Sequence, residues 1–197
     1  MDDGSTDKTL KVAHTLGVPV LHLPFNVRIG GAVQTGLKYA LLYDYDIAIQ
    51  VDADGQHNPK YIPKLIKPIL DGVADIVIGS RFLSDGGAEN PVIRKMGIKY
   101  FSWITSVVLK KNITDCTSGF RALNKKAILL FAKDYPVDFP DAEALIMANF
   151  RNLRIIEIPT PFRARKSGKS SLNRIRTIYY PFKETLSILR LILSGGK

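Results

Sequence analysis

The sequence has little cysteine, no long apolar run and no apolar leader, and each of these absences excludes a class of protein. Its 197 residues include one cysteine, Cys116, which excludes an internal disulfide framework and is compatible with a reducing compartment. No apolar run approaches the roughly 20 residues that a membrane-spanning helix needs. The polar start, "MDDGSTDKT", does not resemble a secretory signal peptide. We therefore expect a globular domain in the cytoplasm.

Acidic side chains are also scarce compared with basic ones. The chain carries 28 lysines and arginines against 18 aspartates and glutamates, a formal net charge of +10. Such a charge favours anionic partners, which include nucleic acid, a phosphorylated substrate and a lipid surface, and it does not choose between them. With 46% hydrophobic residues, the chain is long enough for one domain with a sizeable core.

Apolar strand patterns alternate with helical patterns along the first half of the chain. Helices are predicted over 8–17, 30–43 and 60–70, and strands over 18–23, 46–52 and 74–81. Strands that are apolar on both faces and alternate with helices predict an α/β fold with a mainly parallel central sheet. Ligands of such sheets bind beyond the carboxyl ends of the strands. Asp52, Asp54 and Arg81 follow such ends.

The segment "VDADGQ" places polar groups directly after a buried strand. On an extended chain Asp52, Asp54 and Gln56 would point to one side, and Gly55 would permit a sharp turn. Oxygen ligands of this kind suit Mg²⁺ or Mn²⁺, which bind one or two carboxylates together with substrate phosphates. The spacing by itself is equally compatible with an ordinary Asp-Gly turn.

Six motifs carry a resemblance to a known family. They are "DDGSTDKT" at 2–9, "NVRIGGAVQTG" at 26–36, "VDADGQHNP" at 51–59, "IGSRF" at 78–82, "TSGFRA" at 117–122 and "RKSGKSS" at 165–171. In this order they resemble the family 2 glycosyltransferases, and among them the polyprenyl-phosphate sugar transferases, which include the dolichol-phosphate mannosyltransferases. The resemblance extends from residue 2 to about residue 185.

That resemblance implies a GT-A fold, the Rossmann-like fold of nucleotide-diphospho-sugar transferases, and a metal-dependent, inverting enzyme. Its donor would be a UDP- or GDP-hexose, with a slight preference for UDP-glucose. Its acceptor would be a polyprenyl phosphate or another cell-surface glycan precursor. No residue distinguishes the donor nucleotide or the sugar.

The resemblance also implies roles for particular side chains. Asp3 matches the position that reads the nucleobase edge, and Asp52, which also contacts the donor, forms the Mg²⁺ or Mn²⁺ site with Asp54 and Gln56. Planar guanidinium groups stabilise the charge that develops on a departing nucleoside diphosphate. Three arginines match the positions that hold the donor diphosphate and the acceptor phosphate: Arg81, which is also given a catalytic role, Arg94 and Arg165.

A catalytic base is harder to assign. Asp141 is the first candidate and Glu143 the second, at the start of a predicted helix over 144–151. Acidic residues in a first helical turn are also ordinary partners of the helix dipole. A lipid-phosphate acceptor is already an anion and needs no strong base. His57 is expected to cap or line the metal loop, and Cys116 to be packed rather than reactive.

The sequence departs from the family pattern at its start, where Met1 stands directly before the "DDGS" motif. We therefore expect the first strand of the family to be missing from this sequence. We expect an N-terminally truncated GT-A domain over 1–170 and a C-terminal amphipathic helical segment over 171–197. In that segment Pro181 is predicted to kink or divide the helix, and an apolar stripe is formed by Ile175, Ile178, Tyr179, Phe182, Leu186, Leu189 and Leu193.

Two interpretations of this stripe remain open. The helix either packs on its own domain or lies on a cytoplasmic membrane leaflet or membrane-bound partner, with Tyr100 and Trp103 as a second interfacial element. A homo-oligomer is also compatible with the sequence.

Two other classes compete with the glycosyltransferase prediction. A phosphohydrolase of the haloacid-dehalogenase type also uses D-x-D after a strand, but nearer the chain start and without a residue like Gln56 after the glycine. A nucleic-acid-binding module would suit the charge, but the one basic stretch, 163–176, fits the phosphate loop of the resemblance better, so we expect no nucleic acid partner.

Overall fold

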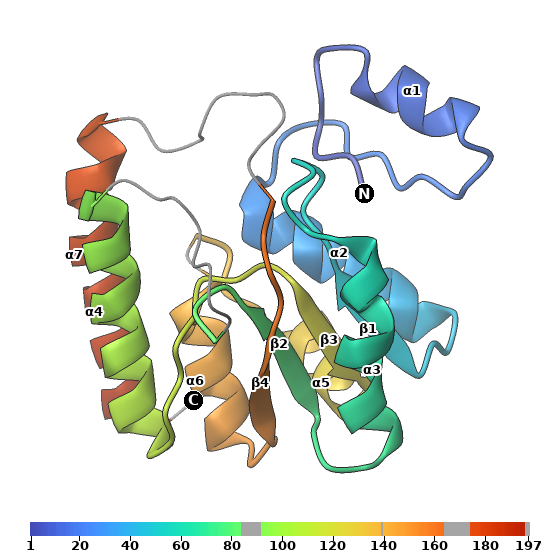
Figure 1. The fold of residues 1–197 in the computed structure, drawn as a ribbon. Coiled ribbons are helices and arrows are strands. Elements are labelled where there is room, and N and C mark those ends of the chain that lie inside the picture. Colours follow the sequence, from blue (N-terminus) through green and yellow to red (C-terminus); the bar gives the residue numbers. More distant parts are fainter. Residues whose placement is uncertain (84–91, 139, 164–173, 196–197) are drawn as a thin grey trace.

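The fold is that of a computed structural model, which describes residues 1–83, 92–138, 140–163 and 174–195. Its helices and strands form an α/β domain with helices on both faces of a sheet (Figure 1). In chain order the elements are α1 (Thr9–Thr15), α2 (Arg28–Leu42), β1 (Ile47–Gln50), a 3-10 turn (Pro59–Tyr61), α3 (Ile62–Leu70), β2 (Ile76–Ser80), α4 (Val92–Leu109), β3 (Arg121–Asn124), α5 (Lys125–Lys133), α6 (Ala142–Phe150), β4 (Ile155–Pro159) and α7 (Arg174–Leu193).

The described sheet is mixed, with the order β1-β3-β2-β4. β1, β2 and β4 run in one direction, but β3 lies antiparallel between β1 and β2, so only β2 and β4 form a parallel pair. The prediction of a mainly parallel sheet therefore holds for strand direction but not for strand pairing. Because β3 is reversed, its beginning lies at the same edge as the carboxyl ends of the other strands. The segment before β3 is thereby brought to the predicted ligand edge.

Apolar side chains cover both faces of the sheet. Ile76 and Ile78 of β2 belong to one core cluster, together with side chains of α2, α4, α5, α6 and α7. Val77, between them, belongs to a second cluster with Leu65 of α3 and Phe120. This alternation follows from the two-residue period of a strand. It explains why the β2 sequence is apolar without interruption.

The N-terminal segment contributes little to the sheet. The strand predicted over 18–23 forms only an isolated parallel bridge between Asp2 and His22, in which the Asp2 amide donates to the Leu21 carbonyl at 2.7 Å. The predicted helix over 8–17 forms as α1, and none of its residues is buried.

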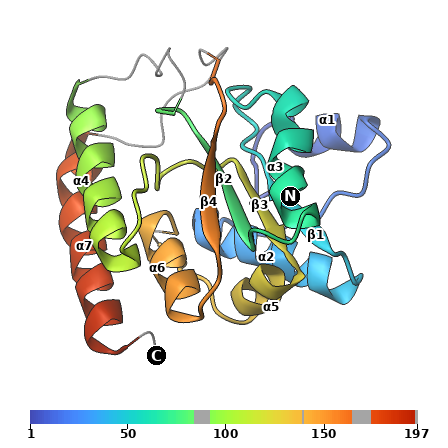
Figure 2. The same ribbon diagram turned by 60° about the horizontal axis from the view of Figure 1, so that its bottom comes forward.

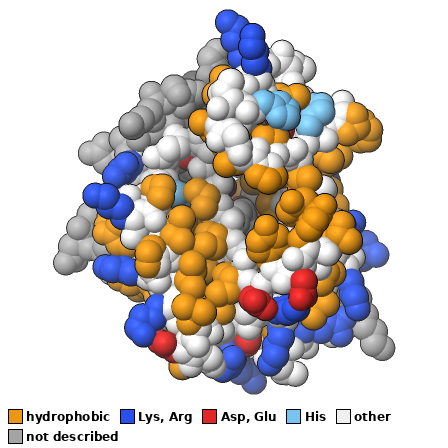
Figure 3. All heavy atoms as spheres, turned by 90° about the vertical axis from the view of Figure 1, so that its right-hand side faces the viewer, with side chains coloured by type: hydrophobic (Ala, Val, Ile, Leu, Met, Phe, Trp, Pro, Cys, Tyr) orange, Lys and Arg blue, Asp and Glu red, His pale blue; other side chains and the backbone are white. Residues whose placement is uncertain are grey.

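β1 lies at an edge of the described sheet, and its residues are only half-buried. Apolar residues that flank it in the sequence are exposed by more than 40%: Leu42, Tyr43, Tyr45 and Val51. Figure 3 views the molecule from the side on which β1 lies and shows hydrophobic side chains gathered there. This side of the domain thus has a more apolar surface than a solvated edge requires.

α4 and α7 lie side by side, as Figures 1 and 2 both show. The Tyr100 hydroxyl on α4 is 3.3 Å from the Thr185 hydroxyl on α7. α7 is one helix that includes Pro181, so the prediction that this proline divides the helix is wrong. Among the described residues, no helix combines the length and the apolar character that crossing a membrane requires.

The described members of the predicted stripe on α7 are all exposed: Phe182, Leu186, Leu189 and Leu193. The side chains of Ile175, Ile178 and Tyr179 lie outside the described residues. Ile188 is buried in the core, whereas apolar residues of the neighbouring α4 are also exposed. On α4 these are Met96, Tyr100, Trp103 and Val107. Both sets have the same spacing of four, three and four residues, which places each set along one face of its helix.

Candidate functional site

The segment from Asp52 to Gln56 forms a turn rather than an extended strand end. β1 ends at Gln50, Gly55 has a φ of +76°, and the Gln56 amide donates to Asp54 Oδ1 at 3.0 Å. The expectation of an extended chain at Asp52 is therefore wrong, because the strand ends at Gln50, whereas the grouping of Asp52, Asp54 and Gln56 stays a prediction. A turn with a positive φ favours glycine at position 55, as the sequence has it.

His57 holds the backbone of Asp52 through a hydrogen bond. The Asp52 amide donates to His57 Nδ1 at 3.0 Å, so the proton of the neutral ring is on Nε2, which lies 3.7 Å from Asp52 Oδ2. The ring stacks on Phe120 and meets Phe162 edge-on. Burial lowers the pKa of His57, more than the nearby carboxylates raise it, so the ring is neutral at neutral pH. The prediction that His57 lines this loop is confirmed.

Gly119 closes the other side of Asp52. A Cβ atom at Gly119 would lie 2.7 Å from both carboxylate oxygens of Asp52, a distance that real contacts do not tolerate. The "TSGF" segment before β3 therefore needs glycine here because the backbone approaches the carboxylate closely. The Asp52 side chain nevertheless stays 42% exposed. It is a partly exposed carboxylate, held between the backbone at Gly119 and a neutral histidine.

Asp52 and Asp54 suit a divalent cation that a ligand helps to hold. No group of three or more histidine, cysteine, aspartate or glutamate side chains able to bind a metal occurs among the described residues. Mg²⁺ and Mn²⁺ typically take one or two carboxylates and complete their shell with substrate phosphates and water. Gln56 donates its amide N–H to the Arg163 carbonyl at 3.4 Å, which leaves its oxygen as a further hard ligand. The residues present fit such a metal.

Arg81 is held by a buried carboxylate. Its guanidinium donates from Nε and Nη2 to the two oxygens of Asp115, at 2.7 and 2.6 Å, and from Nη2 to the Thr117 hydroxyl at 2.6 Å. Arg81 is 6% exposed and Asp115 is fully buried. Burial by itself would lower the pKa of Arg81, but Asp115, with a smaller contribution from Asp141, raises it. The predicted phosphate-binding role of Arg81 stays a prediction, because its main partner is Asp115.

Asp115 in turn belongs to a loop that Glu157 organises. The Glu157 carboxylate on β4 accepts from the Thr114 amide at 2.7 Å and from the Asp115 amide at 2.8 Å. Sequence reasoning missed both acids. A lone aspartate before "TSGF" and a glutamate inside a strand carry no local signal, since only the tertiary fold brings their partners together.

Arg121 connects the "TSGF" segment to the predicted base. Its guanidinium donates to the carbonyls of Cys116 at 2.6 Å, Ser118 at 2.8 Å and Asp141 at 3.1 Å. Arg121 thus holds the backbone of Asp141, which lies just before α6. The charge of Asp141 raises the pKa of Arg81. Cys116 is packed, as predicted, and burial raises the pKa of its thiol to about 12.

The second candidate base, Glu143 on α6, interacts with Ser187 of α7. Burial raises its pKa, and the Ser187 hydroxyl on α7 partly opposes this shift. Its assignment as a base stays a prediction, as does that of Asp141.

The remaining predicted site residues are only partly placed. Both oxygens of Asp3 accept hydrogen bonds, from the Val27 amide at 2.7 Å and from Asn26 Nδ2 at 2.9 Å. Asp3 thus anchors the loop before α2, and its role toward a nucleobase stays a prediction. Arg165 and the side chain of Arg94 lie outside the described residues.

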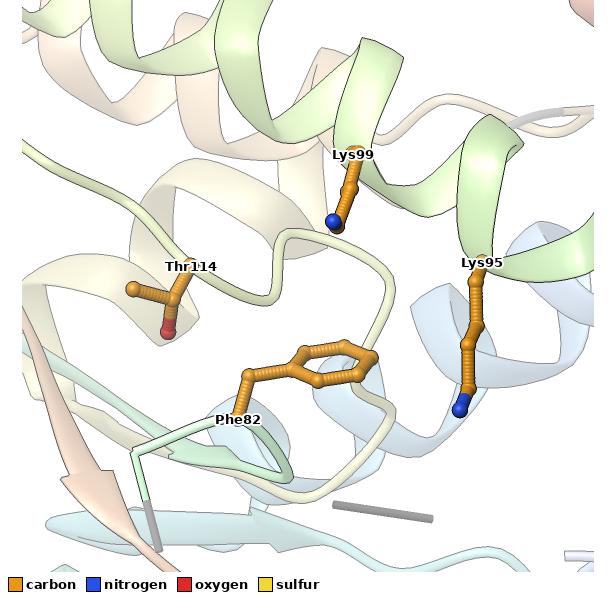
Figure 4. A pocket seen from close by; sticks show the side chains of 4 residues that line it. All are labelled: Phe82, Lys95, Lys99 and Thr114. Carbon is orange, nitrogen blue, oxygen red and sulfur yellow. The ribbon is translucent and has the colours of Figure 1, made fainter. Parts of the chain in front are cut away.

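A cavity of about 400 Å³ opens next to Arg81, lined by Phe82, Lys95, Lys99 and Thr114. Lys95 and Lys99 extend from successive turns of α4 toward the loop that carries Phe82 (Figure 4). Two ammonium groups beside an aromatic ring suit a ligand with an anionic head and an apolar part. Two lysines four residues apart are the one feature of the sequence that could have pointed to this cavity.

Comparison with known proteins decides the family. Residues 1–130 match the model of "Glycosyl transferase family 2". The chain belongs to this family. The match favours the glycosyltransferase prediction over the phosphohydrolase and the nucleic-acid-binding module.

Relatives within the family agree with the polyprenyl-phosphate branch. The chain is 34% identical over 179 residues to the UDP-N-acetylglucosamine–dolichyl-phosphate N-acetylglucosaminyltransferase of Methanococcus voltae, covering 81% of this chain and 71% of that protein. It is 32% identical over 187 residues to the undecaprenyl-phosphate mannosyltransferase of Micrococcus luteus, covering 88% and 74%.

The fold is that of a solved glycosyltransferase. Glucosyl-3-phosphoglycerate synthase from Mycobacterium tuberculosis, in complex with Mn²⁺, UDP-glucose and glycerol 3-phosphate, superposes with a TM-score of 0.70 at 18% identity. The alignment covers 96% of this chain and 66% of that protein, so the chain spans about two thirds of its length. The expected GT-A fold is confirmed.

Proposed function

We propose that this chain transfers a hexose from a nucleotide-sugar donor to a polyprenyl phosphate, with inversion at the sugar. The observation that carries the proposal is the partly exposed Asp52 carboxylate beyond the end of β1, backed by neutral His57 and by the close approach of Gly119. Asp54 follows it in the same turn and accepts from the Gln56 amide. The family and the two named relatives, which act on dolichyl phosphate and undecaprenyl phosphate, support the same substrate class.

The donor end of the site needs a cation. Asp52 and Asp54, with the Gln56 amide oxygen, would hold Mg²⁺ or Mn²⁺, which would neutralise charge on the departing nucleoside diphosphate. Mn²⁺ and UDP-glucose are bound together in the solved mycobacterial enzyme. The protein's own contribution is preorganisation: His57, Phe120 and Gly119 fix Asp52 before any ligand arrives. Fixed groups cost little reorganisation when charge develops.

The acceptor end is the cavity beside Phe82. Lys95 and Lys99 supply positive charge for a phosphate, and the Phe82 ring supplies an apolar wall for the first part of a prenyl chain. Such an acceptor attacks with an oxygen that is already anionic, so no strong base is required. Asp141 remains the candidate base for an acceptor that presents a hydroxyl group.

The exposed stripes of α4 and α7 would bring the enzyme to its lipid. Trp103 and Tyr100 suit the membrane interface, because each has an apolar ring and a polar atom. Phe182 and Leu186 on α7 add apolar area next to them. With a net charge of +10, the chain should lie peripherally on an anionic leaflet.

A transfer assay tests the proposal. Purified protein, Mn²⁺ and a polyprenyl phosphate are incubated with a panel of UDP- and GDP-sugars, and radiolabel in the lipid phase is counted. We expect label from one donor, and a loss of at least about 100-fold in Asp54→Asn, the scale on which removal of one charge-stabilising group acts. Asp71→Asn, an exposed acid paired with Lys67, is the control and should keep full activity. Equal transfer by wild type and Asp54→Asn would overturn the metal assignment.

A further inference from the structure

Glu157 of β4 accepts three hydrogen bonds from the loop that borders the cavity beside Arg81. Its Oε2 accepts from the Thr114 amide at 2.7 Å and from the Thr114 hydroxyl at 3.0 Å, and its Oε1 accepts from the Asp115 amide at 2.8 Å. Both oxygens act as acceptors, as those of a carboxylate do. Because Thr114 lines the cavity, Glu157 holds one wall of it directly.

The strand register places Glu157 close to Ser80, the last residue of β2. The parallel pairing sets Ile78 of β2 opposite Glu157. Side chains alternate with a period of two, so Ser80 points to the same face of the sheet as Ile78. Ile155 of β4, two residues before Glu157, packs in the same core cluster as Ile78. Ser80 and Glu157 therefore lie on one face, at the carboxyl ends of neighbouring strands.

Two hydroxyl groups connect Glu157 to Phe82, which forms another wall of the cavity. The Thr114 hydroxyl donates its only proton to Glu157, so in its 2.7 Å contact with Ser80 the Ser80 hydroxyl is the donor. Ser80 Oγ in turn accepts from the Phe82 amide at 3.2 Å. The bond between Phe82 and Ser80 alone would be an ordinary serine turn. Here it is the last link of a hydroxyl relay that runs from Glu157 through Thr114 and Ser80 to the Phe82 amide.

Glu157 also supports the charged side of the cavity. The Asp115 amide donates to Glu157, and the Asp115 carboxylate holds the Arg81 guanidinium. The Cζ atom of Arg81 lies 5.6 Å from the centre of the Phe82 ring. Figure 4 shows Phe82 and Thr114 across from the two lysines that extend from α4. The positions of these groups around the cavity thus depend on one acid that lies far from them in the sequence.

We propose that Glu157 is a positioning residue for the acceptor, which fixes Thr114 and Phe82 as walls of the acceptor cavity beside Arg81. Glu157 acts through these residues, and no proton is transferred along the relay. Linked hydrogen bonds in the interior polarise one another, so the loss of one link weakens the others. The assignment of the cavity to the acceptor rests on the proposed function, whereas the relay does not.

Amide hydrogen exchange tests the relay without any substrate. Glu157→Gln keeps the size of the side chain but turns an NH₂ group toward either Thr114 or the Asp115 amide, where a donor then faces a donor. We expect the Phe82 amide, which has no direct bond to Glu157, to exchange at least about tenfold faster than in wild type. Ser80→Ala removes the last link and should accelerate the same amide by a similar factor.

Two further interior variants are matched controls. Glu184→Gln also turns a buried acid into an amide, and Thr105→Val removes a buried hydroxyl group. Within the described residues, neither of these side chains makes a hydrogen bond. Both variants should leave the exchange rate of the Phe82 amide and the kinetic constants unchanged, which separates the relay from a general loosening of the interior.

Transfer kinetics then separate positioning from stability, with farnesyl phosphate as the acceptor probe. We expect KM for farnesyl phosphate to rise about tenfold in Glu157→Gln and about threefold in Ser80→Ala. KM for the sugar donor and the affinity for UDP with Mn²⁺ should stay unchanged, because Asp52 is held by His57 and the Gly119 backbone instead. If Glu157→Gln does not fold, Ser80→Ala carries both measurements.

Two results would overturn the proposal. One is a Phe82 amide that exchanges at the wild-type rate in the folded Glu157→Gln and Ser80→Ala variants. The other is an unchanged KM for farnesyl phosphate in these variants with only thermal stability lowered, which would give Glu157 a purely structural role. A wild type that transfers to no prenyl phosphate, but whose Phe82 amide responds to Glu157, would refute the proposed function and leave the relay standing.

Discussion

At the residue scale, three acids in and around the site differ in how buried they are and in which partners they have. Asp52 is exposed beside a neutral histidine, Asp115 is fully buried against Arg81, and Glu184 is buried without a partner. These differences affect stability, because a buried charge without a compensating partner costs free energy in the low-dielectric interior. We therefore propose that the exposed acid binds a ligand, whereas the buried pair stabilises the fold around it.

Asp115→Asn tests the buried pair. The change leaves the Arg81 guanidinium buried without its counter-charge, so the free energy of unfolding should fall by about 3–5 kcal/mol. Urea denaturation of wild type and variant measures it. The control is Asp71→Asn, which removes an exposed i,i+4 pair with Lys67 and should cost less than about 0.5 kcal/mol. Equally small losses in both variants would show that the Arg81–Asp115 pair contributes little to the free energy of unfolding.

At the element scale, most secondary structure could be predicted from the sequence, because hydrophobic periodicity is local. The helices α1, α2 and α3 and the strands β1 and β2 lie close to their predicted ranges. The prediction of a strand over 18–23 was wrong, because strand formation depends on a neighbouring strand that the local sequence does not specify. The ion pair of Arg81 with Asp115 could not be predicted, because the two residues are distant in sequence. The burial of Glu184 could not be predicted either, because it depends on how α7 packs.

Two glycines of α2 test how tightly this helix packs. A Cβ at Gly30 would overlap the carbonyl oxygen of Pro136 and lie 2.5 Å from that of Val137, whereas a Cβ at Gly36 meets nothing within 4 Å. Gly30→Ala should therefore lower the free energy of unfolding by about 1–3 kcal/mol, as overpacking does. Gly36→Ala, in the same helix, should raise it by roughly 0.5–1 kcal/mol. Thermal melts of both variants would reveal similar shifts if the close approach were wrong.

At the scale of the whole molecule, exposed apolar side chains gather on the paired helices α4 and α7 and on the side where β1 lies. The first surface has the regular spacing of two helix faces and is predicted to meet a membrane, and α4 also carries the two lysines of the cavity. The family resemblance alone could not say which residues make that surface, since the exposure of a helix face depends on how the helices pack.

Vesicle sedimentation tests this surface. Trp103→Gln combined with Leu186→Gln should release the protein from anionic vesicles at low salt, because both exposed side chains lie on the paired helices. The matched control, Val12→Gln with Leu16→Gln, changes an exposed side chain of α1 and the exposed residue that follows this helix, and should leave binding unchanged. Wild-type binding that weakens as salt rises is expected. A wild type that stays in the supernatant, or equal losses in both double variants, would contradict the assignment.

The central claim is that Asp52 and Asp54 hold a divalent cation against the donor diphosphate. Isothermal titration calorimetry of UDP and GDP, with and without Mn²⁺, measures this directly in wild type and in Asp54→Asn. We predict nucleotide binding that requires Mn²⁺ in wild type and disappears in Asp54→Asn, while circular dichroism shows both proteins folded. Unchanged affinity of Asp54→Asn for the nucleotide in the presence of Mn²⁺ would contradict the account.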